Sequence, residues 1–339
     1  MSAMFASPFA FAETATPPVT PPDPASLKID VGQARLNVLL QMWYVSDTTA
    51  TTIGRSNFRA RRAEIKLGGN LNPESRWFLM IDPAKSLKAG AVNTANDNKV
   101  LQDLGLAYLF GSSFELSAGQ FKIPTVAESL DSSGDLVLPE RSMVARALGD
   151  KRQLGMQASY KEAKWKLTAM LANGGNANTD DLSHAKDLFV RADFLPFDGF
   201  SVGAWVGANE AEFGSSGKWG FNLRWKGENE FARFEQASSD DTVAGVKTKS
   251  NGYTAEVGYS VLKELQPVLR FERFYPNSGN TDNGKATTFG LNYFLLKNNQ
   301  KLQLSYSWLD RVKGTNGSYV TDLGTGQGRM LLLSFQMAI

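Results

Sequence analysis

The feature that most constrains this chain is a strict alternation of apolar and polar residues that recurs along most of its 339 residues. In residues 218–226, KWGFNLRWK, every second residue is large and apolar: Trp219, Phe221, Leu223 and Trp225. Successive side chains of a strand point to opposite faces, so this spacing predicts a β-strand with one apolar face. The recurrence of the pattern predicts an all-β protein.

The alternation predicts sixteen strands, an even number that suits a bacterial outer-membrane barrel. Most have about ten residues, the length that a tilted strand needs to cross a bilayer. Aromatic residues often fall near the expected strand ends, where girdles at the two membrane interfaces would place them. The expected spans are 34–46, 57–69, 75–84, 98–110, 114–123, 151–161, 164–173, 186–195, 200–208, 217–226, 229–238, 250–261, 263–274, 285–297, 300–311 and 327–338.

Short and long connections broadly alternate between these strands, as in a barrel with short turns at one end and long loops at the other. Long polar links are expected at 46–56, 85–97, 124–150, 173–185, 239–249, 276–284 and 312–326, with a link of middling length at 209–216. A soluble β-sandwich also alternates and is the alternative. Sixteen amphipathic strands would need an unusually large sandwich. Closing the sheet instead removes the unpaired edges that lipid does not tolerate, so we expect a closed antiparallel transmembrane β-barrel.

Composition argues against most enzyme chemistry. The chain has no cysteine and one histidine, His184, which excludes disulfides and thiolate metal sites. Its 36 basic and 34 acidic residues give a net charge of +2, which offers no global field for binding nucleic acid. The sequence contains no run of 18 apolar residues, so it predicts no transmembrane helix. Phosphate-loop, zinc-protease and serine-hydrolase motifs are absent, so we expect no enzyme, no cofactor and no metal. A membrane hydrolase using His184 is a weak alternative.

The first 33 residues are not expected to belong to the barrel. Residues 1–12 read MSAMFASPFAFA, and Ala10-Phe11-Ala12 fits the small-x-small cleavage pattern of a secretory signal peptide. No Lys or Arg precedes the apolar stretch, so one alternative is a signal peptide that starts upstream of Met1. The other alternative is an apolar tail that is not a signal peptide. Residues 13–33 are proline-rich near their start and predict an extended linker. The barrel domain is expected over 34–339.

If the apolar faces contact lipid, the opposite faces line a lumen, which a barrel of about sixteen strands leaves open to water. The inward basic residues expected from the alternation are Arg62, Lys66, Arg76, Lys164, Lys166, Arg191, Lys218, Arg224, Lys226 and Arg270. The inward acidic residues are Glu64, Asp82, Asp103, Asp187, Asp193, Glu256 and Glu272. Because basic lining residues favour anions, this small excess predicts a mild anion preference. For any single residue, a charge paired across the wall is the alternative.

The connection at 124–150 is long for a compact fold, and loops of this length are usually functional. It carries apolar residues that an exposed loop would place poorly: Leu136, Val137, Leu138, Met143, Val144 and Leu148. Folding into the lumen would bury them and narrow the channel. A loop that packs over the rim or against a neighbouring subunit is the alternative.

Several segments, in order and spacing, resemble the phosphate-selective porin O and P family. They are Phe58–Gly69 (FRARRAEIKLGG), Gly119–Pro124 (GQFKIP), Pro139–Ser142 (PERS), Lys151–Gly155 (KRQLG), Leu265–Pro276 (LQPVLRFERFYP) and Thr288–Tyr293 (TFGLNY). The resemblance covers essentially all of 34–339. It implies a sixteen-stranded outer-membrane porin of a Gram-negative bacterium, usually a homotrimer, whose third external loop folds into the lumen.

By that resemblance the third loop is 124–150, and Arg141 and Arg152 lie at or near the constriction. Phosphate-selective members use dense arginine ladders and a lysine cluster, whereas this loop carries five carboxylates against Arg141 and Arg146. Phosphate is thus one possible solute. The candidate pore-lining and anion-binding residues are Arg62, Lys66, Arg76, Lys122, Arg141, Arg146, Arg152, Arg191, Arg224 and Arg270.

The sequence therefore predicts a channel for passive diffusion of small hydrophilic solutes or anions, embedded in outer-membrane lipid. A structural or adhesive outer-membrane barrel that acts through its external loops is the alternative.

Overall fold

The structure is a computed structural model that describes residues 34–47, 55–87, 100–175, 177–180, 185–211, 214–243, 246–276, 284–312 and 326–339. The signal peptide and the linker predicted at 1–12 and 13–33 lie outside these residues, as does His184.

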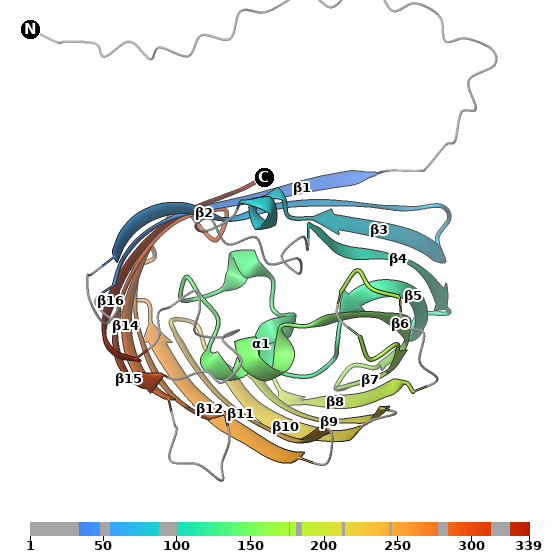
Figure 1. The fold of residues 1–339 in the computed structure, drawn as a ribbon. Coiled ribbons are helices and arrows are strands. Elements are labelled where there is room, and N and C mark those ends of the chain that lie inside the picture. Colours follow the sequence, from blue (N-terminus) through green and yellow to red (C-terminus); the bar gives the residue numbers. More distant parts are fainter. Residues whose placement is uncertain are drawn as a thin grey trace, which may run out of the picture.

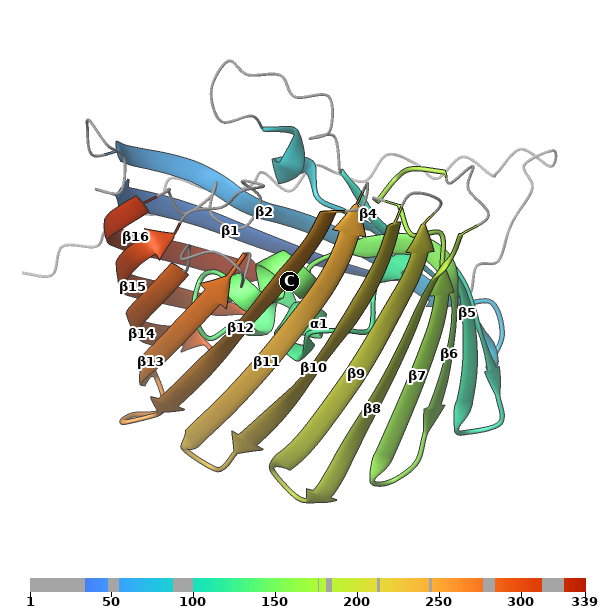
Figure 2. The same cartoon turned by 60° about the horizontal axis from the view of Figure 1, so that its bottom comes forward.

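Sixteen antiparallel strands of the described chain close into one barrel, as Figures 1 and 2 show. Each strand pairs with its neighbours in sequence, so the predicted closed β-barrel is confirmed. The strands are β1 (Arg35–Asp47), β2 (Arg55–Asn70), β3 (Ser75–Ile81), β4 (Leu101–Phe110), β5 (Phe114–Lys122), β6 (Arg152–Lys161), β7 (Trp165–Ala172), β8 (Asp187–Phe197), β9 (Phe200–Ala211), β10 (Gly214–Lys226), β11 (Glu230–Val243), β12 (Val246–Tyr259), β13 (Leu265–Tyr275), β14 (Gly284–Leu296), β15 (Gln300–Val312) and β16 (Gly326–Ala338).

The barrel closes where β1 meets β16. Their ladder runs from Leu39 opposite Ala338 to Asp47 opposite Met330. It continues past the last strand residue, because the Val38 and Ile339 backbones exchange hydrogen bonds of 3.0 and 2.9 Å. Every strand is thereby paired on both sides, which is the condition for a sheet to stand in lipid.

The outer wall carries the apolar residues of the alternation. On β10, Trp219 is 51% exposed on the outside, whereas Asn222 is buried on the inside. The other predicted apolar faces point outward in the same way, and the large side chains exposed there include Met156, Trp165, Tyr253, Phe289 and Trp308. The predicted faces of these strands are therefore confirmed.

Aromatic side chains gather at the barrel end that carries the short turns, and several are in ring contact. Trp165 stacks on Phe194 at 4.2 Å between ring centroids, and Phe197 stacks on Phe200 at 5.2 Å. Trp43 also lies near an expected strand end, where a membrane-facing aromatic residue was predicted, but it faces inward and is only 1% exposed, so the prediction was wrong for this residue. Arg59 and Arg61 lie over its ring at 5.5 and 5.3 Å from the centroid. This cation–π contact holds the indole inside the wall.

Two predicted loops are strand instead. Residues 239–249 were expected to be a long polar link, but β11 runs to Val243 and β12 begins at Val246. Likewise, β9 reaches Ala211 and β10 starts at Gly214, which leaves almost no link at 209–216. Pairing continues in full register across both hairpins, for example Asp240 opposite Lys249. Polar residues hid these strand ends, because a sheet that rises above the membrane needs no apolar face.

The helical turns of the described chain are short. They are η1 (Pro83–Ser86), α1 (Ala127–Leu130), η2 (Ser133–Asp135) and η3 (Ala145–Gly149). None of the helices in the described residues is long and apolar enough to cross a membrane. Three of the four belong to the connection between β5 and β6, residues 124–150.

Candidate functional site: the barrel interior

Residues 124–150, called the inner segment below, lie inside the ring of strands, and Figure 1 shows its helix α1 near the middle of the barrel. Its apolar side packs on the inner wall. The buried cluster joins Val126, Met143, Val144, Ala145 and Leu148 of the segment to Trp205, Ala237, Phe274, Ala286, Leu309 and Met330 of the wall. Burial of a large apolar side chain contributes about 1.5–3 kcal/mol. Packing alone therefore favours one fixed position for the segment.

Three arginines converge on Glu140 of the inner segment. Arg61 and Arg62 of β2 reach its carboxylate at 2.6 and 3.0 Å, and Arg146 reaches it at 2.9 Å. Arg61 and Arg62 are adjacent, yet both point inward because a β-bulge leaves Arg61 without a partner in the β1–β2 ladder. Burial by itself raises the pKa of Glu140, but the arginines outweigh it and hold that pKa well below its usual range.

A second group of arginines binds the start of the inner segment. Glu128 faces Arg233 of β11 at 3.2 Å and Arg270 of β13 at 3.5 Å. Asp131 accepts two hydrogen bonds from Arg224 of β10, at 2.8 and 3.0 Å, in a bidentate pair. Carboxylates of the segment are thus neutralised by arginines of the wall.

Backbone carbonyls of the inner segment are also held by the wall. Lys301 of β15 donates to the carbonyls of Gly134 and Leu136 at 2.9 and 2.7 Å. Asn292 of β14 donates to the Val137 carbonyl at 2.8 Å. A buried loop without regular secondary structure must satisfy its carbonyls in this way.

Arg141 stabilises the inner segment from within. Its guanidinium donates to the carbonyls of Glu128 and Asp131 at 3.2 and 2.9 Å, and it is buried. These bonds tie α1 and the residue that follows it to the stretch that follows Glu140. Arg141 therefore shapes the segment.

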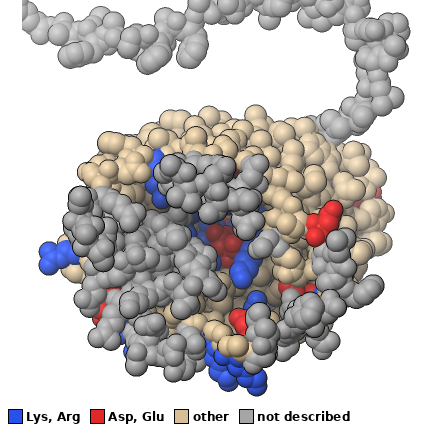
Figure 3. Space-filling model, in the orientation of Figure 1, with Lys and Arg blue, Asp and Glu red and all other residues tan. Residues whose placement is uncertain are grey.

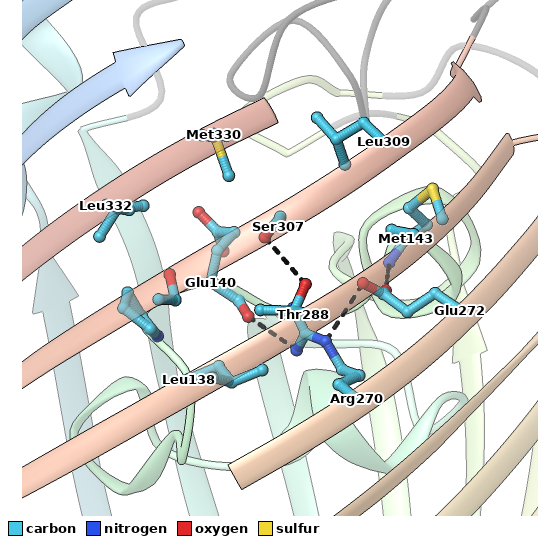
Figure 4. A pocket seen from close by; sticks show the side chains of 13 residues that line it. Leu138, Glu140, Met143, Arg270, Glu272, Thr288, Ser307, Leu309, Met330 and Leu332 are labelled. Carbon is cyan, nitrogen blue, oxygen red and sulfur yellow. Dashed lines mark hydrogen bonds and ion pairs between the residues drawn. The ribbon is translucent and has the colours of Figure 1, made fainter. Parts of the chain in front are cut away.

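The inner segment covers the wall strands β13 to β16. Figure 4 shows the small space left between them, an enclosed pocket of about 30 Å³. There Arg270 donates to the Glu140 carbonyl at 2.9 Å and lies 3.1 Å from the Glu272 carboxylate, which accepts from the Met143 amide at 2.7 Å. This space has room for about a water molecule. The covered wall therefore offers no passage for a solute.

Open space remains on the other side of the inner segment, against β2 to β8. Two cavities of about 370 and 340 Å³ are both lined by Phe78, Asp103, Lys122 and Leu130, so these residues surround the place where the cavities meet. Figure 3 shows charged side chains of both signs in the hollow at the centre of the barrel. The basic residues that line the two cavities are Lys66, Arg76, Lys122, Arg152, Lys166 and Arg191, and the acidic ones are Glu64, Asp103, Glu115, Asp131 and Asp193.

Comparison with protein families identifies this architecture. The family model described as phosphate-selective porin O and P matches residues 39–219, more than half of the chain. The chain belongs to this family. It is therefore a porin of the Gram-negative outer membrane, a channel-forming barrel, as the sequence predicts. No curated protein matches the sequence significantly.

Solved porins share the fold of this porin at low sequence identity. An anion-selective porin from Comamonas acidovorans aligns with a TM-score of 0.69 at 10% identity, over 91% of this chain and 99% of that one. OmpT of Vibrio cholerae aligns with a TM-score of 0.62 at 10% identity, over 92% and 99%. The outer-membrane channel DcaP of Acinetobacter baumannii aligns with a TM-score of 0.65 at 11% identity, over 90% of this chain and 97% of that one. The likeness spans the whole barrel.

The basic residues predicted to line the pore of this porin fall into two sets. One set is engaged with or within the inner segment: Arg62, Arg141, Arg146, Arg224 and Arg270. The other set lines the open cavities: Lys66, Arg76, Lys122, Arg152 and Arg191. Two residues belong partly to both sets. Arg191 also donates to the Thr125 carbonyl, and Lys122 also donates to the carbonyls of Ser129 and Asp131.

Sequence reasoning missed several residues that shape the interior of this porin. Arg61 was not expected inward, since only the bulge turns it there. Arg233, which binds Glu128 and Glu256, lies in a strand whose alternation did mark it as inward. Phe78, Phe121 and Leu130 line the open space although they are apolar. Alternation also placed Phe78 and Phe121 on the polar face, and this signal could have found them.

In the described residues, no group of three or more His, Cys, Asp or Glu side chains could hold a metal ion.

Proposed function

We propose that this porin is a passive diffusion channel for small hydrophilic solutes with a mild preference for anions. The observation that carries the proposal is the open space beside the inner segment, lined by six basic and five acidic side chains. The inner segment occupies the other side of the lumen and so sets the width of the passage. Lining charges of one sign favour ions of the other in such a passage.

The distribution of ion pairs supports an anion preference. Arg76 pairs with Glu115, Arg152 with Asp103, and Lys66 with Glu64. Within the described part of the chain, Lys122 and Lys166 have no carboxylate within 4.0 Å. The other four basic residues that line the two cavities each have an ion pair with a carboxylate.

The acidity of the inner segment does not oppose this preference. Glu128 and Glu140 are buried among wall arginines, and Asp131 is paired with Arg224 and Arg233. An anion passing on the open side therefore meets few unbalanced negative charges from the segment.

The similar structures add two parts to the proposal. One is described as an anion-selective porin, and another is a trimer form of OmpT. We propose that this porin likewise prefers anions, phosphate among them, and that it assembles as a homotrimer whose remaining outer wall contacts lipid.

Ion substitution in planar bilayers tests the function. The purified porin in a KCl gradient is expected to give stepwise conductance and a reversal potential on the chloride side. Replacing chloride by a bulky anion should lower the current more than replacing potassium by a bulky cation. A folded porin that gives no steps would contradict the channel. Steps with a reversal potential on the potassium side would contradict the anion preference alone.

A further inference from the structure

The open lumen carries an apolar patch, which a channel for hydrophilic solutes does not need. Phe78 of β3 lines both of the cavities described above and also a third, of about 500 Å³, at the short-turn end. Phe121 of β5 lies beside it at 6.3 Å between ring centroids. Leu130 at the end of α1 is 38% exposed and lines the two cavities that meet there. Apolar surface left in water costs about 25 cal/mol per Å².

The backbone is built to hold these rings against the wall. A Cβ atom at Gly105 would lie 2.6 Å from the tip of the Phe78 ring, so a larger residue would displace the ring. Gly119, opposite Gly105 in the β4–β5 ladder, has φ of +143° and no room for a Cβ atom beside the Leu104 carbonyl. The two glycines leave a shallow bay on the inner wall, and the Phe78 ring fills part of it.

A cation stands next to the patch. Lys122 follows Phe121 in the chain and lines the same two cavities as Phe78 and Leu130. Its ammonium donates to the carbonyls of Ser129 and Asp131. These partners hold the ammonium in place but leave its charge uncompensated by a carboxylate within 4.0 Å, in the residues that the structure describes.

We infer that this place is a binding site for small aromatic carboxylates on their way through the pore. The aromatic ring of the solute packs on Phe78, Phe121 and Leu130, while its carboxylate faces the ammonium of Lys122. Ring–ring contact of this kind contributes about 0.5–1.5 kcal/mol beyond the area it buries. An inorganic anion or acetate would use the lysine alone. The inference rests on the proposed channel function and names a solute class for it.

Competition with chloride current tests the site. Wild-type porin in KCl is titrated with benzoate and, in parallel, with acetate, and the concentration that halves the current is measured for each. Benzoate is expected to act at about a fivefold lower concentration than acetate, the ratio that ring contact supports. Equal concentrations for the two anions would overturn the aromatic site and leave the channel function standing. Absence of any current would instead refute the channel.

Variants assign the effect to residues. Phe78→Leu keeps the apolar character of the wall but removes the aromatic ring, and should remove the benzoate preference while chloride conductance persists. Lys122→Gln should raise the half-blocking concentration of both anions. Phe110→Leu, the same substitution on the outer face of β4, is the matched control and should behave like wild type. A benzoate preference that survives Phe78→Leu would overturn the site.

Discussion

The inner wall of this porin has two regions that use inward-pointing basic residues differently. Under the inner segment, Arg62, Arg233 and Arg270 bind carboxylates and carbonyls of the segment and are buried or nearly so. On the open side, between β2 and β8, Lys122 and Lys166 line the cavities and have no carboxylate within 4.0 Å in the described chain, although the Lys122 ammonium also donates to two carbonyls at the edge of the segment. A basic side chain that points inward from a strand thus either forms a structural ion pair or presents its charge to a passing solute. What decides is whether the segment lies over that part of the wall.

The strongest test of this contrast is Glu140→Gln. Removing one partner of a buried ion pair costs about 3–5 kcal/mol, because the remaining charges are left unpaired. Three arginines lose their carboxylate here, so the inner segment is expected to leave the wall part of the time. Single-channel recordings should show larger and fluctuating conductance steps.

The matched control is Glu115→Gln on the open side. Its partner Arg76 is half exposed, and an exposed pair contributes about 0–1 kcal/mol. This variant should keep the wild-type step size. Equal behaviour of the two variants would break the distinction between the regions.

A steric change on the open side should have an intermediate effect. In Gly105→Ala, the added Cβ atom would lie 2.6 Å from the Phe78 ring and 2.7 Å from the Ala118 carbonyl oxygen, so it strains the β4–β5 ladder and pushes the ring toward the passage. Overpacking of this kind costs about 1–3 kcal/mol. We expect a lower unfolding temperature and a smaller conductance. Gly217→Ala, where the Cβ atom meets nothing within 4 Å, should change neither.

Neutralising a charge separates the regions by selectivity. At about 7 Å in water, one charge changes the energy of a passing ion by about 0.6 kcal/mol, or about threefold in permeability. Lys122→Gln is therefore expected to lower the chloride-to-potassium permeability ratio by about that factor, measured from the reversal potential. Arg62→Gln removes a buried partner of Glu140 and should loosen the inner segment as Glu140→Gln does, but while the segment is docked it should leave the ratio unchanged. A larger shift for Arg62→Gln than for Lys122→Gln would reverse the assignment.

Acidification should have the smallest effect. The pKa of Glu140 is well below its usual range in the docked segment, against about 4.3 for a free glutamate. Docking is therefore fully favoured above the free value and weakens progressively as pH falls from the free value to the lower, docked value. Conductance histograms at pH 7 and pH 5 should both show one peak of unchanged width. Additional larger conductance steps at pH 5 would contradict the view that the ion pairs of Glu140 hold the inner segment on the wall.

Much of the architecture followed from the sequence because it depends on local alternation. Every second residue from Trp219 to Trp225 is large and apolar, which marks the face of the strand that contacts lipid. Repetition of this alternation along the chain predicted a closed barrel of sixteen strands. The same reasoning failed at 239–249 and at Trp43. The first is a polar hairpin that needs no apolar face, and the second is an aromatic residue stabilised inside by Arg59 and Arg61.

The sequence by itself determined which side of each strand meets lipid, because successive side chains of a strand point to opposite faces. Only the tertiary structure decided which inward charges meet water. Arg61 joins Glu140 through a bulge, and Arg270 reaches the inner segment from a strand far along the chain. Charges compensate one another according to distance in space, and the position of the inner segment fixes those distances.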